Sequence, residues 1–112
     1  MKIYFINNGD SNSNNIFNLL GKTELLPITE KKEYSFRTTK NDYVIVSGFK
    51  MQDERNEVLK KYNNLIVITE QKDQETISCL VNDFNAKDII YSLVNPEYIS
   101  QRIVKYISKN ME

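Results

Sequence analysis

A chain of 112 residues has room for one domain, and it can bury a modest core without disulfides or a structural metal. Its 15 basic and 15 acidic residues balance and are interspersed, so neither nucleic acid nor an anionic membrane is expected as a partner. Because histidine is absent, the chain cannot build a thiol–imidazole or serine–imidazole catalytic pair, and zinc loses its commonest ligands; the single Cys79 excludes an internal disulfide.

The apolar segments also indicate the cellular environment that we expect for the protein. None approaches the roughly 20 residues of a transmembrane helix, and the first residues enter a strand-like run instead of the apolar region of a signal peptide. We therefore expect a reducing, cytoplasmic environment. The richness in Asn, Lys and Ile is typical of an AT-rich bacterial genome.

The first half of the chain predicts a strand, a helix and a second strand. Residues 2–6 form a short, nearly continuous apolar run, which is typical of a strand buried on both faces of a parallel sheet. Residues 11–20 place apolar side chains at helical spacing, with Ser11 or Asn12 as the cap and Gly21 at the end. We expect the second strand near residues 23–28, followed by an irregular or short helical connection to Tyr43.

The second half alternates strands and helices more regularly. Strands are predicted at residues 43–46, 65–68 and 88–91, and helices at residues 53–62, 73–84 and from Asn95-Pro96 to about Ser108. Asp53 and Asp73 are the expected N-caps of the first two helices. The predicted inward-facing side chains of the three helices are Val58, Leu59 and Tyr62; Ile77, Leu80, Val81 and Phe84; and Ile99, Ile103, Tyr106 and Ile107. This alternation predicts a parallel sheet with right-handed crossovers and helices on both faces.

Polar side chains follow the predicted strands at the points where the strands end. In a doubly wound sheet, ligands bind beyond the carboxyl ends of the strands, at the switch point of strand order. The side chains at these positions are Asn7, Asn8, Ser47, Thr69 and Ser92. They are the candidate site residues of the chain.

Three segments carry a resemblance to a known family. Residues 42–47, DYVIVS, resemble the third strand of a response-regulator receiver domain, which reads roughly D-L-V-I-L-D, and residues 65–69, LIVIT, resemble its fourth strand. Residues 85–97, NAKDIIYSLVNPE, match the family phrase G-A-D-D-Y-I-x-K-P-F-x-P-E without a gap. The resemblance covers essentially the whole chain and is strongest from Asp42 onward. It implies one receiver-like domain over residues 1–112, with the α/β, flavodoxin-like (CheY-like) three-layer sandwich and a five-stranded parallel sheet of order 2-1-3-4-5.

The same resemblance implies that the phosphoryl chemistry of the family is absent here. Asn7 and Asn8 occupy the positions of the carboxylate pair that holds magnesium, Ser47 that of the acceptor aspartate, and Ser92 that of the lysine that neutralises the phosphoryl group. Only Thr69 is retained. Amide oxygens are weaker ligands for a hard dication, and a serine hydroxyl needs a base before it can attack a phosphoryl donor. We therefore expect a degenerate phosphorylation site without a metal, a cofactor or enzymatic activity.

The resemblance also indicates a partner surface. Tyr91, Val94, Tyr98 and Ile99 fall on or beside the face that receivers build from their fourth helix, fifth strand and fifth helix for dimerisation and output. The expected role is a protein–protein interaction or dimerisation module, regulatory or localising. It would be a stand-alone protein or the N-terminal domain of a larger one, such as a ParA/MinD-like ATPase of pilus assembly. For Tyr91 and Tyr98, core packing is the alternative.

Two further alternatives stay open in the sequence. A small flavodoxin-like enzyme or phosphocarrier would use Ser47 or Cys79, although residues 9–14 only loosely resemble a phosphate-binding loop. A relocated metal site would use Asp10 with Asn8 and Ser47, but a single carboxylate is thin support, and a capping or solvated Asp10 is favoured. The loosely basic stretch Lys31, Lys32, Arg37 and Lys40 is diluted by acidic neighbours and predicts a solvated surface.

Overall fold

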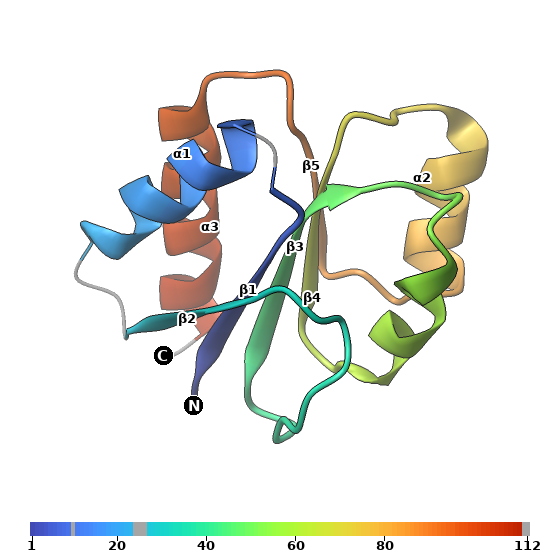
Figure 1. The fold of residues 1–112 in the computed structure, drawn as a ribbon, viewed down its shortest axis with the longest axis horizontal. Helices are drawn as coiled ribbons and strands as arrows, with labels where there is room; N and C mark the ends of the chain where they lie inside the picture. Colours follow the sequence, from blue (N-terminus) through green and yellow to red (C-terminus); the bar gives the residue numbers. More distant parts are fainter. Residues whose placement is uncertain (10, 24–26, 111–112) are drawn as a thin grey trace.

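Five parallel strands form one sheet in the order β2-β1-β3-β4-β5 (Figure 1) in the computed structural model, which describes residues 1–9, 11–23 and 27–110. The strands are β1 (Ile3–Asn7), β2 (Ile28–Lys31), β3 (Tyr43–Phe49), β4 (Leu65–Thr69) and β5 (Asp88–Tyr91). This order is that of the flavodoxin-like fold, whose switch point lies between β1 and β3. The predicted α/β class, parallel sheet and strand order are confirmed.

Helices lie on both sides of this sheet. They are α1 (Ser11–Gly21), the 3-10 helix η1 (Glu54–Lys61), α2 (Gln74–Asn82) and α3 (Pro96–Asn110). Figure 1 shows α1 and α3 on one side and η1 and α2 on the other. None of the helices within the described ranges is both long enough and apolar enough to cross a lipid bilayer.

Alternate side chains along the strands belong to two separate hydrophobic clusters, because successive side chains of a strand point to opposite faces of the sheet. The α1–α3 cluster contains Ile3, Phe5, Ile16, Leu20, Tyr43, Ile45, Ile66, Ile68, Ile90, Ile99, Ile103 and Ile107. The η1–α2 cluster contains Tyr4, Ile6, Tyr34, Val44, Val46, Phe49, Leu59, Tyr62, Leu65, Val67, Leu80 and Phe84. A substitution such as Ile66→Ala in the central layer is expected to cost about 2–5 kcal/mol, through lost burial and the cavity left behind.

Capping interactions are present at the start of three helices, and those of Asp53 and Asp73 were predicted. The carboxylate of Asp53 accepts a hydrogen bond from the backbone N–H of Arg55, and that of Asp73 accepts one from the N–H of Thr76. The side-chain oxygen of Asn95 accepts one from the N–H of Glu97 at the start of α3. Each bond satisfies a donor that the first turn of a helix leaves free.

The segment of η1 differs from the prediction in its helix type. Its inward side chains recur every three residues, at Asn56, Leu59 and Tyr62, and this period suits a 3-10 helix, in which residues three apart are aligned. Val58 is therefore turned out and 36% exposed, so its predicted inward position is wrong.

Predictions for the other three helices need smaller corrections. Val81 of α2, predicted to face inward, is 51% exposed. Asn12 lies inside α1 and donates to the carbonyl of Ser92, so it is not the cap of that helix. In α3, which continues past Ser108 to Asn110, Ile99 is fully buried against the sheet.

The connection from β2 to β3 contains no helix in residues 32–42, so of the two predicted alternatives, irregular or short helical, the irregular connection is confirmed. The strand itself was predicted too early. It begins after Pro27, which lacks an N–H group for the sheet, and residues 24–26 of the predicted strand lie outside the described part of the chain. Asp42 fixes the end of the connection, because its carboxylate accepts from the backbone N–H groups of Lys2 and Thr39, each at 2.8 Å.

Candidate functional site

The predicted site residues do gather at the carboxyl ends of the strands. Asn7 of β1 lies beside Ser47 of β3 in the sheet, and Thr69 ends β4. Gly48 adopts a left-handed conformation with φ of 87°, and the register shifts there so that Phe49 pairs with Thr69. A residue with a Cβ atom would be strained at this φ, so glycine permits the bulge that shapes this edge of the sheet.

Ser47, at the position of the acceptor in the family resemblance, faces a helix. Its hydroxyl lies 2.6 Å from the hydroxyl of Ser13 on α1, and both side chains are buried. No carboxylate among the described residues is hydrogen-bonded to Ser47 to act as a base, and the chain contains no histidine. The contact joins the sheet to α1 and leaves the Ser47 oxygen shielded from an incoming phosphoryl donor.

Asn7, in the position of a metal ligand, has both ends of its amide engaged. Its nitrogen donates to Oδ1 of Asn14 at 2.8 Å and to a carboxylate oxygen of Glu30 at 2.7 Å. Its oxygen accepts from the backbone N–H of Gly9 at 2.7 Å. The side chain therefore links β1 to α1 and β2, and its oxygen is directed at the backbone.

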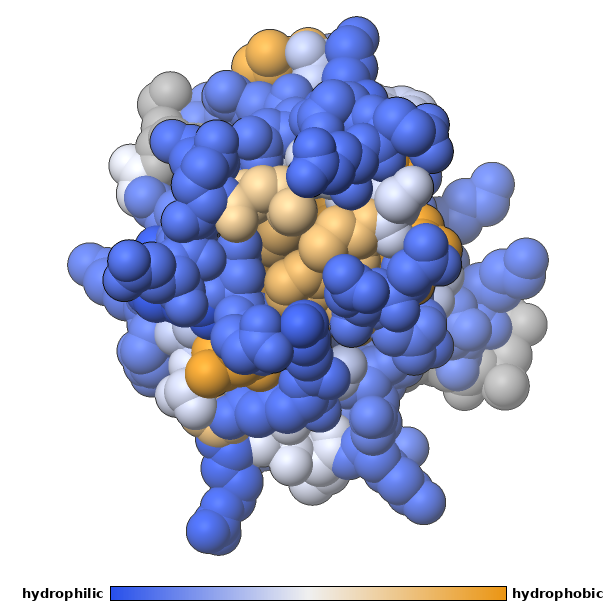
Figure 2. Space-filling view, turned by 90° about the vertical axis from the view of Figure 1, so that its right-hand side faces the viewer, coloured by the Kyte–Doolittle hydropathy of each residue, from blue (hydrophilic) through white to orange (hydrophobic). Residues whose placement is uncertain are grey.

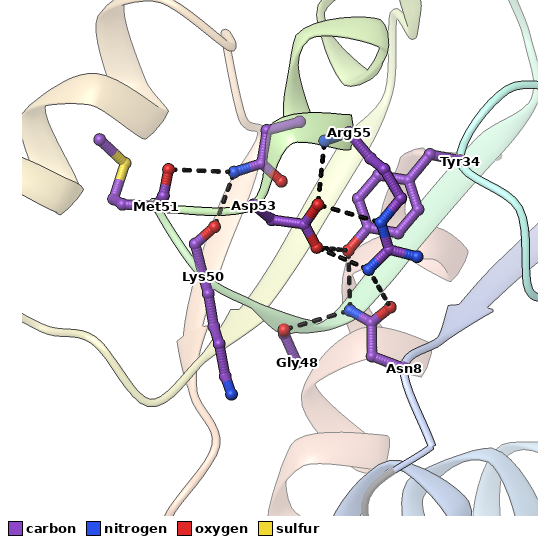
Figure 3. Close-up of polar contacts among 8 residues, drawn as sticks. Asn8, Tyr34, Gly48, Lys50, Met51, Asp53 and Arg55 are labelled. Atoms are coloured by element: carbon purple, nitrogen blue, oxygen red, sulfur yellow. Dashed lines mark hydrogen bonds and ion pairs between the residues drawn. The ribbon is translucent and has the colours of Figure 1, made fainter.

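Asn8 belongs to a polar cluster that covers the next part of this edge (Figure 3). Its nitrogen donates to the Tyr34 hydroxyl at 2.8 Å and to the carbonyl of Gly48 at 3.1 Å. Nη2 of Arg55 reaches the Asn8 oxygen at 3.5 Å. We call Asn8, Tyr34, Asp53 and Arg55 the Arg55 cluster.

Arg55 is held in the cluster by a bidentate ion pair and an aromatic ring. Its Nη2 and Nε donate to the two carboxylate oxygens of Asp53 at 2.6 and 3.0 Å, and its guanidinium lies 4.1 Å from the centre of the Tyr34 ring. The hydrogen bond from Arg55 lowers the pKa of Asp53 to about 2, and burial raises the pKa of Tyr34. At neutral pH the pair is charged and Tyr34 is protonated, so the cluster is electrically balanced.

Thr69 and Ser92 hold backbone in place. The Thr69 hydroxyl donates to the carbonyl of Phe49 at 2.8 Å and accepts from the N–H of Gln71 at 3.0 Å. The N–H of Ser92 donates to the carbonyl of Thr69 at 2.9 Å, and the Ser92 side chain is buried. Both residues thus help to close the loops that follow β4 and β5.

Among the residues that the structure describes, this edge of the sheet offers few ligands for a metal ion. No three Asp, Glu, Cys or His side chains are grouped there to share an ion. Two carboxylates at this edge are already engaged, that of Glu30 with Asn7 and that of Asp53 with Arg55. Asp10, on which the relocated metal site depended, lies outside the described residues.

Sequence reasoning missed Glu30, Tyr34 and Arg55 as members of this region. The Asp53-x-Arg55 spacing was the one available signal, since an N-cap carboxylate followed two residues later by arginine can form a local ion pair. Tyr34 and Glu30 come from the irregular connection and from the edge strand β2, and neither carries a motif.

The candidate interface residues fall into two groups. Tyr98 is 53% exposed and Val94 is 38% exposed, while Tyr91 is half-buried with the Lys72 ammonium 4.6 Å from its ring centre. Ile99 is fully buried in the α1–α3 cluster, which confirms its predicted inward position, and its prediction as an interface residue is wrong. We define the β5 face as Tyr91, Val94 and Tyr98.

Cys79 lies on α2, half-buried against the η1–α2 cluster and away from the strand-end residues. The thiol of Cys79 donates to Asp83, and burial together with that carboxylate raises the pKa of the thiol. A raised pKa disfavours the thiolate that a phosphocarrier would need.

On the side of the molecule that carries η1 and α2, hydrophilic side chains surround a pale apolar patch (Figure 2).

In comparisons with known proteins, no family model, no curated protein and no solved structure matches the chain. The family resemblance therefore rests on the residues of this chain and on its strand order.

Proposed function

We propose that the chain is a receiver-like protein–protein interaction module without phosphoryl-transfer chemistry, built as a CheY-like three-layer sandwich. One observation carries most of the proposal: the acceptor-position hydroxyl of Ser47 is buried and bonded to Ser13 of α1. A phosphoacceptor has to meet its donor at the surface, and this oxygen does not. Metal-free regulation by association is the function that such a scaffold retains.

Electrostatics supports the same proposal. A phosphorylated receiver needs a divalent cation and a lysine beside the acceptor, because the transferred group carries negative charge. Here Asn7, Asn8 and Ser92 are neutral, and the nearby cation Arg55 is already paired with Asp53. The strand-end residues thus stabilise the carboxyl edge of the sheet and supply no unpaired positive charge to an incoming phosphoryl group.

The β5 face is the proposed surface for a protein partner or for a second copy of the chain. Tyr98 in α3 and Val94 just before it expose apolar area, and large apolar side chains with a polar tip are frequent at interfaces. The role would be regulatory or localising, in a bacterial cytoplasm, either alone or at the N-terminus of a larger protein such as a ParA/MinD-like ATPase.

Treatment with a small phosphodonor tests the proposal. The protein is incubated with acetyl phosphate and magnesium beside a phosphorylatable receiver as the positive control, and intact masses are measured. We expect the control to gain a phosphoryl group and this chain to remain unchanged. A reproducible phosphoryl adduct would contradict the proposal. Co-purification from the native cells with wild-type and Tyr98→Glu baits then identifies the partner of the β5 face.

A further inference from the structure

The segment from β2 to β3 crosses the sheet as an extended coil on the side of η1 (Figure 1). It is held at two points. The Tyr62 hydroxyl donates to the carbonyl of Tyr34 at 2.6 Å and accepts from the N–H of Phe36 at 3.2 Å, and Asp42 accepts from the N–H of Thr39. Arg37 and Thr38 lie between these anchor points, so their backbone has a defined place on the surface.

Two adjoining hollows share Arg37 and Thr38 as common lining residues. One, of about 530 Å³, is also lined by Ser35, Phe36 and Lys61. The other, of about 260 Å³, is also lined by Lys2, Tyr4 and Thr39 among others. Each hollow therefore has a lysine of its own, and Arg37 stands between them.

Arg37 differs from the other two arginines of the chain. Arg55 and Arg102 each form a bidentate pair with an aspartate, Asp53 and Asp88 respectively. The guanidinium of Arg37 makes no hydrogen bond or ion pair with any residue in the ranges 1–9, 11–23 and 27–110. A guanidinium presents a planar fork of donors that matches a carboxylate, and here that fork is free.

The neighbouring charges leave this surface positive. Lys61 Nζ bonds the hydroxyl of Ser35 at 2.8 Å and has no acidic partner among the described residues. Asp42, the acidic residue that lines the smaller hollow, is buried and is used by the backbone N–H groups of Lys2 and Thr39. A ligand with carboxylates would complement Lys2, Arg37 and Lys61.

We propose that Arg37, flanked by Lys2 and Lys61, docks an acidic segment of a partner protein. The two hollows adjoin and each contains a cation, so a chain with several carboxylates fits them better than one small anion. Nucleic acid fits less well, since base stacking needs a free aromatic face. The Phe36 ring is packed against Tyr4 and Tyr62, with centroids 4.8 and 5.2 Å apart, and Lys31 Nζ lies 5.2 Å from its centre.

This docking surface is lined by Lys2, residues 35–39 and Lys61 and shares no residue with the β5 face. It therefore goes beyond the proposed function and does not depend on it.

Titration of the amide NMR spectrum with hexaglutamate tests the proposal, with hexaglutamine as the uncharged control peptide. We expect saturable shift changes confined to the amides of residues 35–39 and those near Lys2 and Lys61. The Arg37→Gln variant is expected to bind hexaglutamate about tenfold more weakly, the loss typical of one charge-assisted hydrogen bond. Lys105→Gln, an exposed site on α3, removes the same charge elsewhere and is expected to leave binding unchanged.

Four results would overturn the inference. These are the absence of localised shifts, equal weakening by Lys105→Gln and Arg37→Gln, the same shifts with inorganic phosphate alone, and tighter binding of an oligothymidylate. The third would indicate a small-anion site and the fourth a nucleic-acid surface. Because the side chain of Arg37 is exposed, the substitution is expected to leave the fold intact, and circular dichroism of the variant checks this.

Discussion

The hydroxyl oxygens of Ser47 on β3 and Ser13 on α1 lie 2.6 Å apart, and each residue is about 1% exposed. The contact joins the middle strand of the sheet to the helix that covers it. The position that would carry the acceptor in a phosphorylated receiver therefore contributes to packing in this chain.

Removing either hydroxyl is expected to destabilise the fold. Ser47→Ala leaves the Ser13 hydroxyl buried with one partner fewer, which costs about 1–2 kcal/mol of the free energy of unfolding. The double variant Ser13→Ala/Ser47→Ala is expected to cost less than the sum of the two single variants, because it removes both partners together. Urea denaturation of the four proteins measures this coupling. Strict additivity would show that the two hydroxyls do not stabilise each other.

The pair of Asp53 and Arg55 predicts a pH dependence. The pKa of Asp53 falls from its ordinary value of 3.8 to about 2 in the folded protein, mainly because Arg55 donates to the carboxylate. A lowered pKa stabilises the fold above the unfolded value, and this stabilisation is lost as the pH falls from about 4 to about 2. Since the Arg55 side chain is 53% exposed, solvent reduces the contribution to about 1 kcal/mol.

Asp53→Asn isolates this effect, because asparagine keeps the capping hydrogen bond and loses the charge. Other carboxylates also titrate in this range, so the useful quantity is the difference in unfolding free energy between wild type and variant. We expect this difference to be largest above pH 5 and to vanish near pH 2. A difference that does not change with pH would mean that the ion pair contributes nothing to stability.

The sequence predicted the sheet well because short apolar runs mark most of its strands. Runs such as residues 65–68 are apolar at every position, and such runs suit a strand covered on both faces. Capping at Asp53 and Asp73 was equally predictable, since it depends on contacts within four residues. The start of β2 was not, because the weak strand pattern extends across Pro27.

The candidate site was predictable only in its position. Strand ends in a parallel sheet meet at one edge, which placed Asn7, Ser47 and Thr69 correctly. The partners of these residues come from elsewhere: Tyr34 reaches Asn8 across 26 residues, and Arg55 reaches it across 47. Those contacts depend on the path of an irregular connection, and neither periodicity nor a motif encodes that path.

Magnesium is expected not to bind at millimolar concentration. The amides of Asn7 and Asn8 supply no negative charge, and their oxygens accept from Gly9 and Arg55. Isothermal titration calorimetry measures the binding directly. Saturable binding that is abolished by Asp10→Ala would instead support the relocated site.

Placing a carboxylate at position 7 is expected to destabilise the fold. Asn7→Asp places a second negative charge where the amide now donates to Glu30 at 2.7 Å, so the two carboxylates repel each other. We expect the variant to lose about 1–3 kcal/mol of unfolding free energy at pH 7 and to regain part of it when magnesium is added. Asn14→Asp, on the exposed side of the same contact, is the matched control for added charge. Full stability of Asn7→Asp without magnesium would mean that the contact with Glu30 is dispensable.

Replacing Tyr98 tests the β5 face as the surface for association. Tyr98→Glu puts a charge on a residue that is 53% exposed in the first turn of α3, where a carboxylate interacts favourably with the helix dipole. We therefore expect the unfolding free energy to change by less than about 0.5 kcal/mol, while self-association or partner binding weakens about tenfold or more. Ser108→Glu, exposed near the other end of α3, adds the same charge away from the β5 face and is the control for association. Light scattering measures the oligomeric state, and circular dichroism the fold. A dimer that survives Tyr98→Glu unchanged would place the interface elsewhere, and an unfolded variant would assign Tyr98 to the core.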